Sequence, residues 1–398
     1  MTSVNFASIN GTTLTAGATR FVMFSGEYNY RTTEAEAESL VASAGTMQNA
    51  YAELTAAPGV GNTVTCTLRK NGADTTIVVT FSGTATQAND TTHTVTVAAG
   101  DRLCWSVVTS ASTSASTLRI SAQYVGDTAK ESILAGGSGA NTLGADTTTR
   151  YTSVGGLSFG DTTQTNVQMT CPTAGTLKKL YIRLTAAPGA GDTRTFTIYK
   201  NGSSTGLTVT ISDVATTGND TSNTVAVVAG DLLALQCAAT GTPADAGLQF
   251  GFALEATTDG DFAVLAGTTD DPSTGATVFS FLNISPGFTF GSETQFLCGQ
   301  AFYMTALYAQ VGVAPGVGKS WALTVRNNAT DTALSATISG TNVTGSSTGS
   351  VAVANYDNLC LESTPTGTPT SSGTIKWGVN MTFVAPTADY TPVSSWYF

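Results

Sequence analysis

The chain contains a single histidine, His93, and this limits the nucleophilic chemistry that its other residues can support. A catalytic serine or cysteine needs a base positioned to take its proton. The residue 130 positions further along belongs to a second copy of the same sequence pattern; it is Asn223, which cannot act as that base. We therefore interpret His93 as a surface residue at the start of a strand and expect no site built from several histidines.

Three glutamates, Glu34, Glu36 and Glu38, alternate in a stretch that we predict to be a β-strand. Alternate residues of a strand share one face, so successive carboxylates would lie roughly 7 Å apart and could collect a divalent cation or a basic partner surface. The corresponding residues of the second copy keep the polarity but lose the charge; they are Gln164, Asn166 and Gln168. This loss favours a solvated strand face over a binding site.

Aspartates recur at equivalent turns. Residues 89–90 and 219–220 both read Asn-Asp, and Asp101, Asp231 and Asp357 each stand just before a predicted strand. A calcium site needs several converging oxygen ligands, whereas an Asx turn explains the Asn-Asp pairs without an ion. We interpret the three later aspartates as caps of their own backbone. No metal and no cofactor is predicted.

The pattern that positions these residues occurs three times. Residues 54–61 read LTAAPGVG, residues 184–191 read LTAAPGAG and residues 311–318 read VGVAPGVG. Each copy then has a turn that reads Lys-Asn-Gly in the first two copies and Asn-Asn-Ala in the third, and a second turn that reads Ala-Gly-Asp, Ala-Gly-Asp and Asn-Tyr-Asp. The first two copies align at 130 residues and the third follows at 126 or 127. A repeat of this length is a whole domain, because solenoid units run roughly 20–50 residues.

Period-two alternation within the copies predicts half-buried strands. Ala50, Ala52 and Leu54 alternate with polar residues or tyrosine, as do their counterparts, and the next strand runs into Asn-Gly, the strongest short hairpin signal. The stretch 33–43 is rich in helix formers, but its counterpart 163–173 reads as a strand, so we predict strands for both. Roughly eight strands per copy predict an all-β chain of three tandem homologous antiparallel β-sandwich domains of jelly-roll type.

We place the domains at residues 1–126, 127–256 and 257–398. The small-residue stretches 127–149 and 256–277 resemble flexible connectors. We also expect residues 1–18 to form a polar N-terminal arm outside the repeat, and residues 384–398 to form an aromatic C-terminal tail.

Composition narrows the classes of function. Only 11% of the 398 residues are charged, and the net charge is −11 with no basic run. Nucleic-acid binding needs clustered Lys and Arg, so we expect none. The N-terminus lacks the features of a signal peptide and no apolar run reaches membrane-span length, so we expect cytoplasmic synthesis and no membrane partner. The cysteines align with Val, Ala, Leu or Phe of other copies, which indicates core residues rather than zinc ligands or disulfides.

Aromatic residues at two places are the interface candidates. Tyrosine stands at the same strand position of every copy, pointing away from the predicted core, and four aromatic residues lie in the Pro-punctuated tail. The tail could dock into a neighbouring subunit or fold back on its own domain. The candidates are Tyr51, Tyr181, Tyr308, Tyr390, Trp396, Tyr397 and Phe398.

The repeated motifs TAAPGxG, KNG and VAAGD resemble β modules of tailed-bacteriophage structural proteins such as fibres, spikes and head decorations. The resemblance implies a non-enzymatic virion subunit, made in the host cytoplasm and bound to other capsid or tail proteins. It also implies a homo-oligomer, with a trimer as one form; three linked copies could instead make a pseudo-threefold unit within one chain. The alternatives are a host-surface or glycan-binding adhesin and, second, a polysaccharide depolymerase. Paired carboxylates for the latter are set by the fold, and no copy carries an inserted loop that marks an active site.

Overall fold

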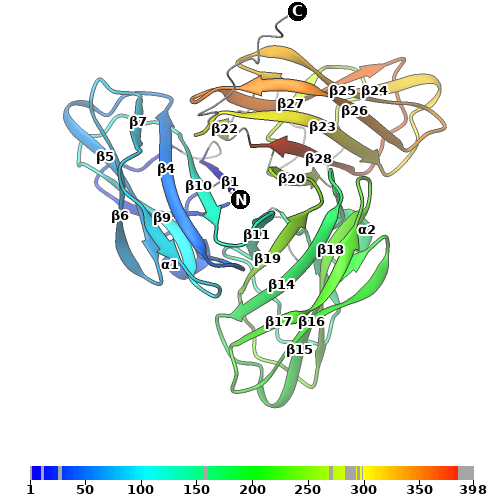
Figure 1. The fold of residues 1–398 in the computed structure, drawn as a ribbon, viewed down its shortest axis with the longest axis horizontal. Helices are drawn as coiled ribbons and strands as arrows, with labels where there is room; N and C mark the ends of the chain where they lie inside the picture. Colours follow the sequence, from blue (N-terminus) through cyan, green and yellow to red (C-terminus); the bar gives the residue numbers. More distant parts are fainter. Residues whose placement is uncertain are drawn as a thin grey trace, which may run out of the picture.

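The computed structural model describes residues 2–9, 13–25, 29–155, 160–268, 272–282, 293, 296–297 and 299–383. Strands dominate these residues, and they form six antiparallel sheets that pack in pairs as three sandwiches. The sandwiches follow one another along the chain and lie at the corners of a triangle, coloured blue to cyan, green, and yellow to red (Figure 1). The all-β prediction is confirmed.

Each sandwich has the same strand order. We count eight main strands in each sandwich and leave out the short strands β3 (Ser39–Leu40), β8 (Val95–Val97), β13 (Met169–Thr170) and β22 (Phe296–Leu297). One sheet contains main strands one, eight, three and six in that order, and the other contains main strands two, seven, four and five, which is a jelly-roll arrangement. In sandwich 1 the sheets are β1 (Thr2–Ile9), β10 (Leu118–Gly126), β4 (Gly45–Leu54) and β7 (Gln87–Asp90) with β8 (Val95–Val97), and β2 (Thr19–Met23), β9 (Arg102–Thr109), β5 (Gly59–Lys70) and β6 (Ala73–Gly83) with β3 (Ser39–Leu40). In sandwich 2 they are β11 (Glu131–Gly137), β19 (Leu248–Ala256), β14 (Gly175–Leu184) and β17 (Thr217–Val227), and β12 (Arg150–Thr152), β18 (Leu232–Thr240), β15 (Gly189–Lys200) and β16 (Ser203–Asp213) with β13 (Met169–Thr170). In sandwich 3 they are β20 (Asp261–Thr268), β28 (Ile375–Thr382), β23 (Phe302–Val311) and β26 (Thr344–Val353), and β21 (Val278–Ser280), β27 (Asn358–Thr366), β24 (Gly316–Asn327) and β25 (Thr330–Gly340) with β22 (Phe296–Leu297).

Each sandwich has a core filled mainly by alternate residues of its own facing strands. Ile133 of β11 also packs into the core of sandwich 1, and Ala263 and Leu265 of β20 pack into the core of sandwich 2. In β5, Cys66 and Leu68 are fully buried and pack with Trp105 of β9. The described cysteines confirm their interpretation as core residues: Cys66, Cys104, Cys171, Cys237 and Cys360 are all buried and free. Burial raises the pKa of the Cys66 thiol to about 12, so it stays protonated and apolar in behaviour.

The hairpin after the fourth strand keeps one shape in all copies, although its sequence changes. Asn71 and Gly72 have φ of 54° and 82°, as a two-residue hairpin turn of the favoured hand requires. In sandwich 3 the same positions are Asn328 and Ala329, with φ of 48° and 63°. Ala329 therefore adopts a left-handed conformation that favours glycine.

The prediction of strands over residues 33–43 and 163–173 is wrong for the first half of each range. Glu34–Ala37 forms a single helical turn, α1, and Gln164–Val167 forms its counterpart, α2, before the short strands β3 and β13. The reasoning that both copies share one conformation holds. Helix propensity does not decide this turn, because α2 forms from Gln-Thr-Asn-Val without it. In the first copy a bidentate ion pair from Glu34 to Arg69 holds the turn against β5.

Two further expectations need correction. The stretches that resembled flexible connectors contain β11 and β20, the first strands of sandwiches 2 and 3, whose residues pair with β19 and β28. The predicted N-terminal arm contains β1, which pairs with β10 in the same position. Small residues in these segments let neighbouring groups pack closely. A Cβ on Gly136, for example, would lie 2.6 Å from the Phe250 ring, which is too close for any larger residue.

The three sandwiches close into a ring through repeated contacts. A strand of one sandwich packs on a short edge strand of the preceding one: β19 contacts β3, β28 contacts β13 and β10 contacts β22. The first two contacts are close, because a Cβ on Gly251 or Gly378 would lie 2.1 Å from the carbonyl oxygen of Leu40 or Thr170. A head-to-tail contact that recurs three times closes a ring. One chain thus forms a pseudo-threefold unit.

Candidate functional site: the three seams between sandwiches

The contacts between sandwiches define three seams, which we call seam 1/2, seam 2/3 and seam 3/1 after the sandwiches that they join. Each seam receives an outward-facing cross-strand pair from the third and eighth strands of one sandwich. The pairs are Arg183 with Gln249 in seam 1/2, Gln310 with Lys376 in seam 2/3, and Glu53 with Arg119 in seam 3/1. Because these positions are equivalent in the fold, differences between the seams come from side chains.

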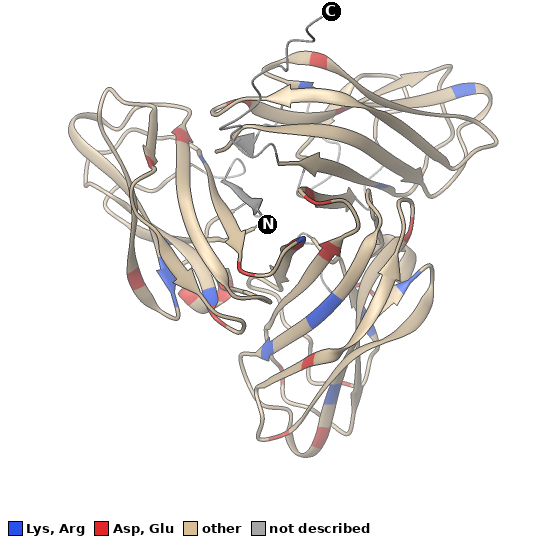
Figure 2. Ribbon diagram, viewed as in Figure 1, with Lys and Arg blue, Asp and Glu red and all other residues tan. Residues whose placement is uncertain are grey.

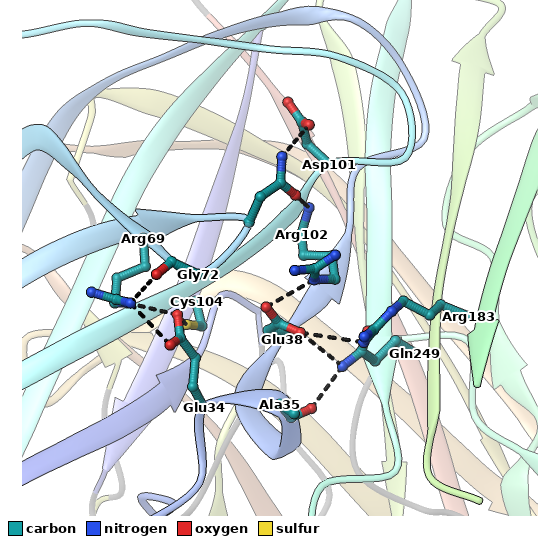
Figure 3. A network of polar contacts seen from close by, with 11 residues as sticks. Glu34, Ala35, Glu38, Arg69, Gly72, Asp101, Arg102, Cys104, Arg183 and Gln249 are labelled. Atoms are coloured by element: carbon teal, nitrogen blue, oxygen red, sulfur yellow. Dashed lines mark hydrogen bonds and ion pairs between the residues drawn. The ribbon is translucent and has the colours of Figure 1, made fainter. Parts of the chain in front are cut away.

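Seam 1/2 is built around the carboxylate of Glu38, which is only 5% exposed. Arg102 Nε of the same sandwich donates to it at 2.9 Å, and Arg183 Nη1 of sandwich 2 donates at 3.4 Å (Figure 3). Gln249 Nε2 donates to the same carboxylate at 3.3 Å and to the Ala35 carbonyl at 2.6 Å. This network joins α1 and β9 of sandwich 1 to β14 and β19 of sandwich 2.

Glu34, Glu36 and Glu38 therefore do not share one solvated strand face, and that prediction is wrong. Glu34 accepts two hydrogen bonds from Arg69 within sandwich 1, at 2.6 and 3.0 Å, and lies away from the Glu38 network in Figure 3. Glu36 is half-buried beside a smaller cavity of about 250 Å³. The backbone of α1 turns by roughly 100° per residue, which places Glu36 about 200° around from Glu34. The chain is extended again at Glu38, so the three side chains are not aligned as they would be on one strand.

Seam 3/1 carries a neutral cluster in the equivalent place. Arg119 Nη1 donates to Glu53 Oε2 at 2.8 Å and to Asn358 Oδ1 of sandwich 3 at 3.0 Å. Asn358 Nδ2 in turn donates to Glu53 Oε2 at 3.1 Å. Here the cross-strand pair supplies both charges, and the facing sandwich supplies an amide.

Tyr51, Tyr181 and Tyr308 all point away from their own cores and face the second repeated turn of the preceding sandwich. The Tyr51 ring meets Tyr356 edge-to-face at 5.1 Å, and its hydroxyl accepts a hydrogen bond from Asn355 Nδ2 at 3.0 Å. A Cβ on Gly100 would lie 3.9 Å from the Tyr181 ring. Tyr308 and Gly230 line one cavity of about 310 Å³. The tyrosines therefore lie at contacts within the chain.

The other interface candidates, Tyr390, Trp396, Tyr397 and Phe398, lie outside the described residues.

Seam 2/3 contains a cavity of about 620 Å³, lined by residues of both sandwiches. Gln168, which is equivalent to Glu38, lines it from sandwich 2, and Gln310 and Lys376 line it from sandwich 3. Lys376 is 4% exposed and its ammonium has no hydrogen bond or ion pair with any described residue. Burial alone lowers the pKa of Lys376 to about 8.

The buried Glu131 ties sandwich 2 to sandwich 1 close to the ring's centre. Lys178 and Lys179 lie 2.6 and 2.7 Å from its carboxylate, and the Ser43 hydroxyl of sandwich 1 donates to it at 2.5 Å. Burial favours the neutral carboxyl, but the hydrogen bonds outweigh it, so the pKa of Glu131 lies below its usual value. Figure 2 shows how sparse such charges are over the rest of the fold.

The aspartates of the Asn-Asp pairs accept backbone hydrogen bonds two residues on, as an Asx turn predicts. The pairs lie in strands β7 and β17, however, and not in loops. Asp90 accepts hydrogen bonds from the amides of Val78, Thr92 and His93 at 2.9 to 3.2 Å. Burial acts to raise the pKa of Asp90, but these hydrogen bonds outweigh it and lower the pKa to about 2. His93 is an exposed residue whose Nδ1 lies 3.0 Å from this carboxylate.

The capping role of the later aspartates is also confirmed, and the sequence reasoning missed their second role. Asp101 Oδ2 accepts from the Ala98 amide at 2.8 Å, and Asp101 Oδ1 accepts from Asn71 Nδ2 at 2.7 Å. The Asn-Gly turn and the Gly-Asp turn are thus fastened together. Asn201 with Asp231 and Asn328 with Asp357 repeat the link at 2.7 Å. Recurrence of both residues in all copies was the available signal.

No protein-family model and no curated protein matches the chain. Within the described ranges, no cluster of three or more His, Cys, Asp or Glu could hold a metal ion. No helix in that part of the chain is long and apolar enough to cross a membrane.

Proposed function

We propose that the chain is a non-enzymatic structural subunit on the surface of a bacteriophage particle, a decoration, spike or fibre component. The observation that carries the proposal is the closed ring of three jelly rolls made by one polypeptide. Jelly rolls are a common building unit of viral shells. Fold alone does not identify function, so the argument rests on the ring together with the repeated motifs.

The ring supplies what a subunit at a site of threefold character needs. The three sandwiches have the same strand order and lie around a common centre, so the chain offers three equivalent sets of strands to a symmetric support. Low charge, 11% of the residues, is compatible with surfaces that stay covered in an assembly. The partners in this proposal are capsid or tail proteins and further copies of the chain, and the location is the virion.

Immunogold electron microscopy tests the proposal with an antibody raised against the recombinant chain. Particles and cells from the culture that produces the protein are labelled side by side. Label on phage-like heads or tails supports the proposal and locates the subunit. Label confined to cell envelopes contradicts it and favours the adhesin, and release of sugar from host polysaccharide by the purified chain contradicts the non-enzymatic assignment.

A further inference from the structure

The three seams act as comparisons for one another, since equivalent strands meet in each. In seam 1/2 the position of Glu38 supplies a carboxylate that satisfies cationic and amide groups from the next sandwich. In seam 3/1 the carboxylate comes from Glu53. Seam 2/3 has Gln168 and Gln310 at these two positions, so neither of them supplies a carboxylate to the cation Lys376, and no acidic residue among those described lines its cavity.

Lys376 is held at the cavity by the strand that carries it. Ile375 and Trp377 face the core of sandwich 3, so Lys376 between them faces sandwich 2, as does Gly378 against the Thr170 carbonyl. Its neighbours on the flanking strands are Gln310 and Gly267, neither of which is charged. An ammonium on a side chain that is only 4% exposed, with no ionic partner among the described residues, costs free energy. A ligand in the cavity that brings the missing charge would offset that cost.

The other residues that line the cavity indicate which groups the ligand carries besides its negative charge. Gln168 is 5% exposed, and no described residue forms a hydrogen bond with its side-chain amide. Further polar groups around the cavity come from Asn166, Asn201 and Thr374, with Val311 and Val343 as apolar surface. Pockets of 300 to 1,000 Å³ suit small molecules, and about 620 Å³ accommodates one or two sugar rings.

We propose that the cavity of seam 2/3 binds a hydroxylated carboxylic acid of the hexuronic acid class. The ligand's carboxylate pairs with the Lys376 ammonium, in the place that Glu38 fills in seam 1/2. Its hydroxyls exchange hydrogen bonds with the amides of Gln168 and Gln310. This assignment stands whether or not the chain is a virion component.

Isothermal titration calorimetry with the full chain tests the site, with D-glucuronate as the probe. D-Glucose, which has the hydroxyls without the carboxylate, and acetate, which has the carboxylate without the hydroxyls, are the two control ligands. Glucuronate is expected to bind at least tenfold more tightly than either, because glucose lacks the charge and acetate lacks the hydroxyls. Equal affinity for glucose and glucuronate overturns the role of Lys376, and equal affinity for acetate and glucuronate overturns the sugar class. No heat with glucuronate at about 1 mM, a concentration that detects even weak binding, overturns the site.

Two variants separate binding from folding. Lys376→Met keeps the length of the side chain and removes the charge; we expect at least a tenfold loss of glucuronate affinity. Gln168→Glu installs the carboxylate of seam 1/2 beside Lys376, and we expect it to abolish glucuronate binding while the chain stays folded. Lys319→Met, the same change at a half-buried lysine of sandwich 3 that does not line the cavity, is the control. Unchanged affinity in either cavity variant overturns the proposal.

Discussion

Replacing Lys376 by methionine should stabilise the protein at neutral pH, although it removes a charged side chain from a seam. The pKa of this lysine falls from 10.5 to about 8 on folding, because burial disfavours the ammonium. Each pKa unit corresponds to 1.36 kcal/mol, so the charge destabilises the folded chain by about 3 kcal/mol at pH 7. Lys376→Met removes that term and fills the same space with an apolar chain.

The dependence on pH follows from the direction of this pKa shift. The unfolded chain binds the proton more tightly than the folded chain, so the wild type gains stability as pH rises from about 8 to 10.5. The advantage of Lys376→Met should therefore be largest at neutral pH and smaller at pH 10. Because Met cannot titrate, the difference between the two proteins isolates this one group.

Urea unfolding measures the change in the free energy of unfolding. Tryptophan fluorescence identifies the transition of sandwich 3, because Trp321 and Trp377 lie in its core. If sandwich 3 unfolds as a unit, about 3 kcal/mol raises its Tm by roughly 10 °C. Lys319→Met should change the free energy of unfolding by less than about 0.5 kcal/mol. A Lys376→Met variant no more stable than wild type at pH 7 would refute the reasoning, because it would show that the ammonium is solvated or paired.

Three further predictions concern other elements. Glu38→Gln gives seam 1/2 the residue found in seam 2/3 and leaves the partly exposed Arg102 and Arg183 without a carboxylate; we expect a loss of about 2 kcal/mol in urea unfolding, and an unchanged midpoint would contradict the role of this network. Ala329→Gly relieves the positive φ of the third hairpin turn and should add about 1 kcal/mol, whereas destabilisation would show that the turn is not strained. Asp90→Asn should cost about 2 kcal/mol at pH 7; since the pKa of Asp90 is depressed to about 2, the contribution is present above pH 4 and fades toward pH 2, so a difference that persists at pH 2 would contradict this origin.

The sequence predicted the strands and turns because their signals are local. Alternation of Ala50, Ala52 and Leu54 and the Asn-Gly turn each involve a few neighbouring residues. The helical turn α1 was missed because the prediction relied on a second copy that lacks the same helix propensity. The strands β11 and β20 were missed because Gly and Ala, read as connectors, pack tightly against rings and backbone.

The seams could not be predicted from the sequence because they join residues far apart in the chain. Glu38 meets Arg183, and Arg119 meets Asn358, across two different sandwiches. The alternation of apolar and polar residues placed these side chains on the outer face of a sheet, and we interpreted that face as exposed to solvent. Lys376 lies on that face and is nevertheless 4% exposed, since a second sandwich covers it. Only the closed ring reveals which residues of the outer faces are buried at a seam.

Fusion of three copies into one chain has a consequence that a homotrimer lacks. In a symmetric trimer the three interfaces are identical, so every substitution changes all of them at once. Within one chain, seam 1/2 has a carboxylate between two arginines, seam 3/1 has a neutral cluster, and seam 2/3 has glutamine at both equivalent positions beside a cavity. Two stable seams hold the ring at high effective concentration, so the third can carry a destabilising lysine. The destabilisation of the folded chain by Lys376 and the ligand site proposed around it have one cause, which is the difference in side chains between seam 2/3 and the other two seams.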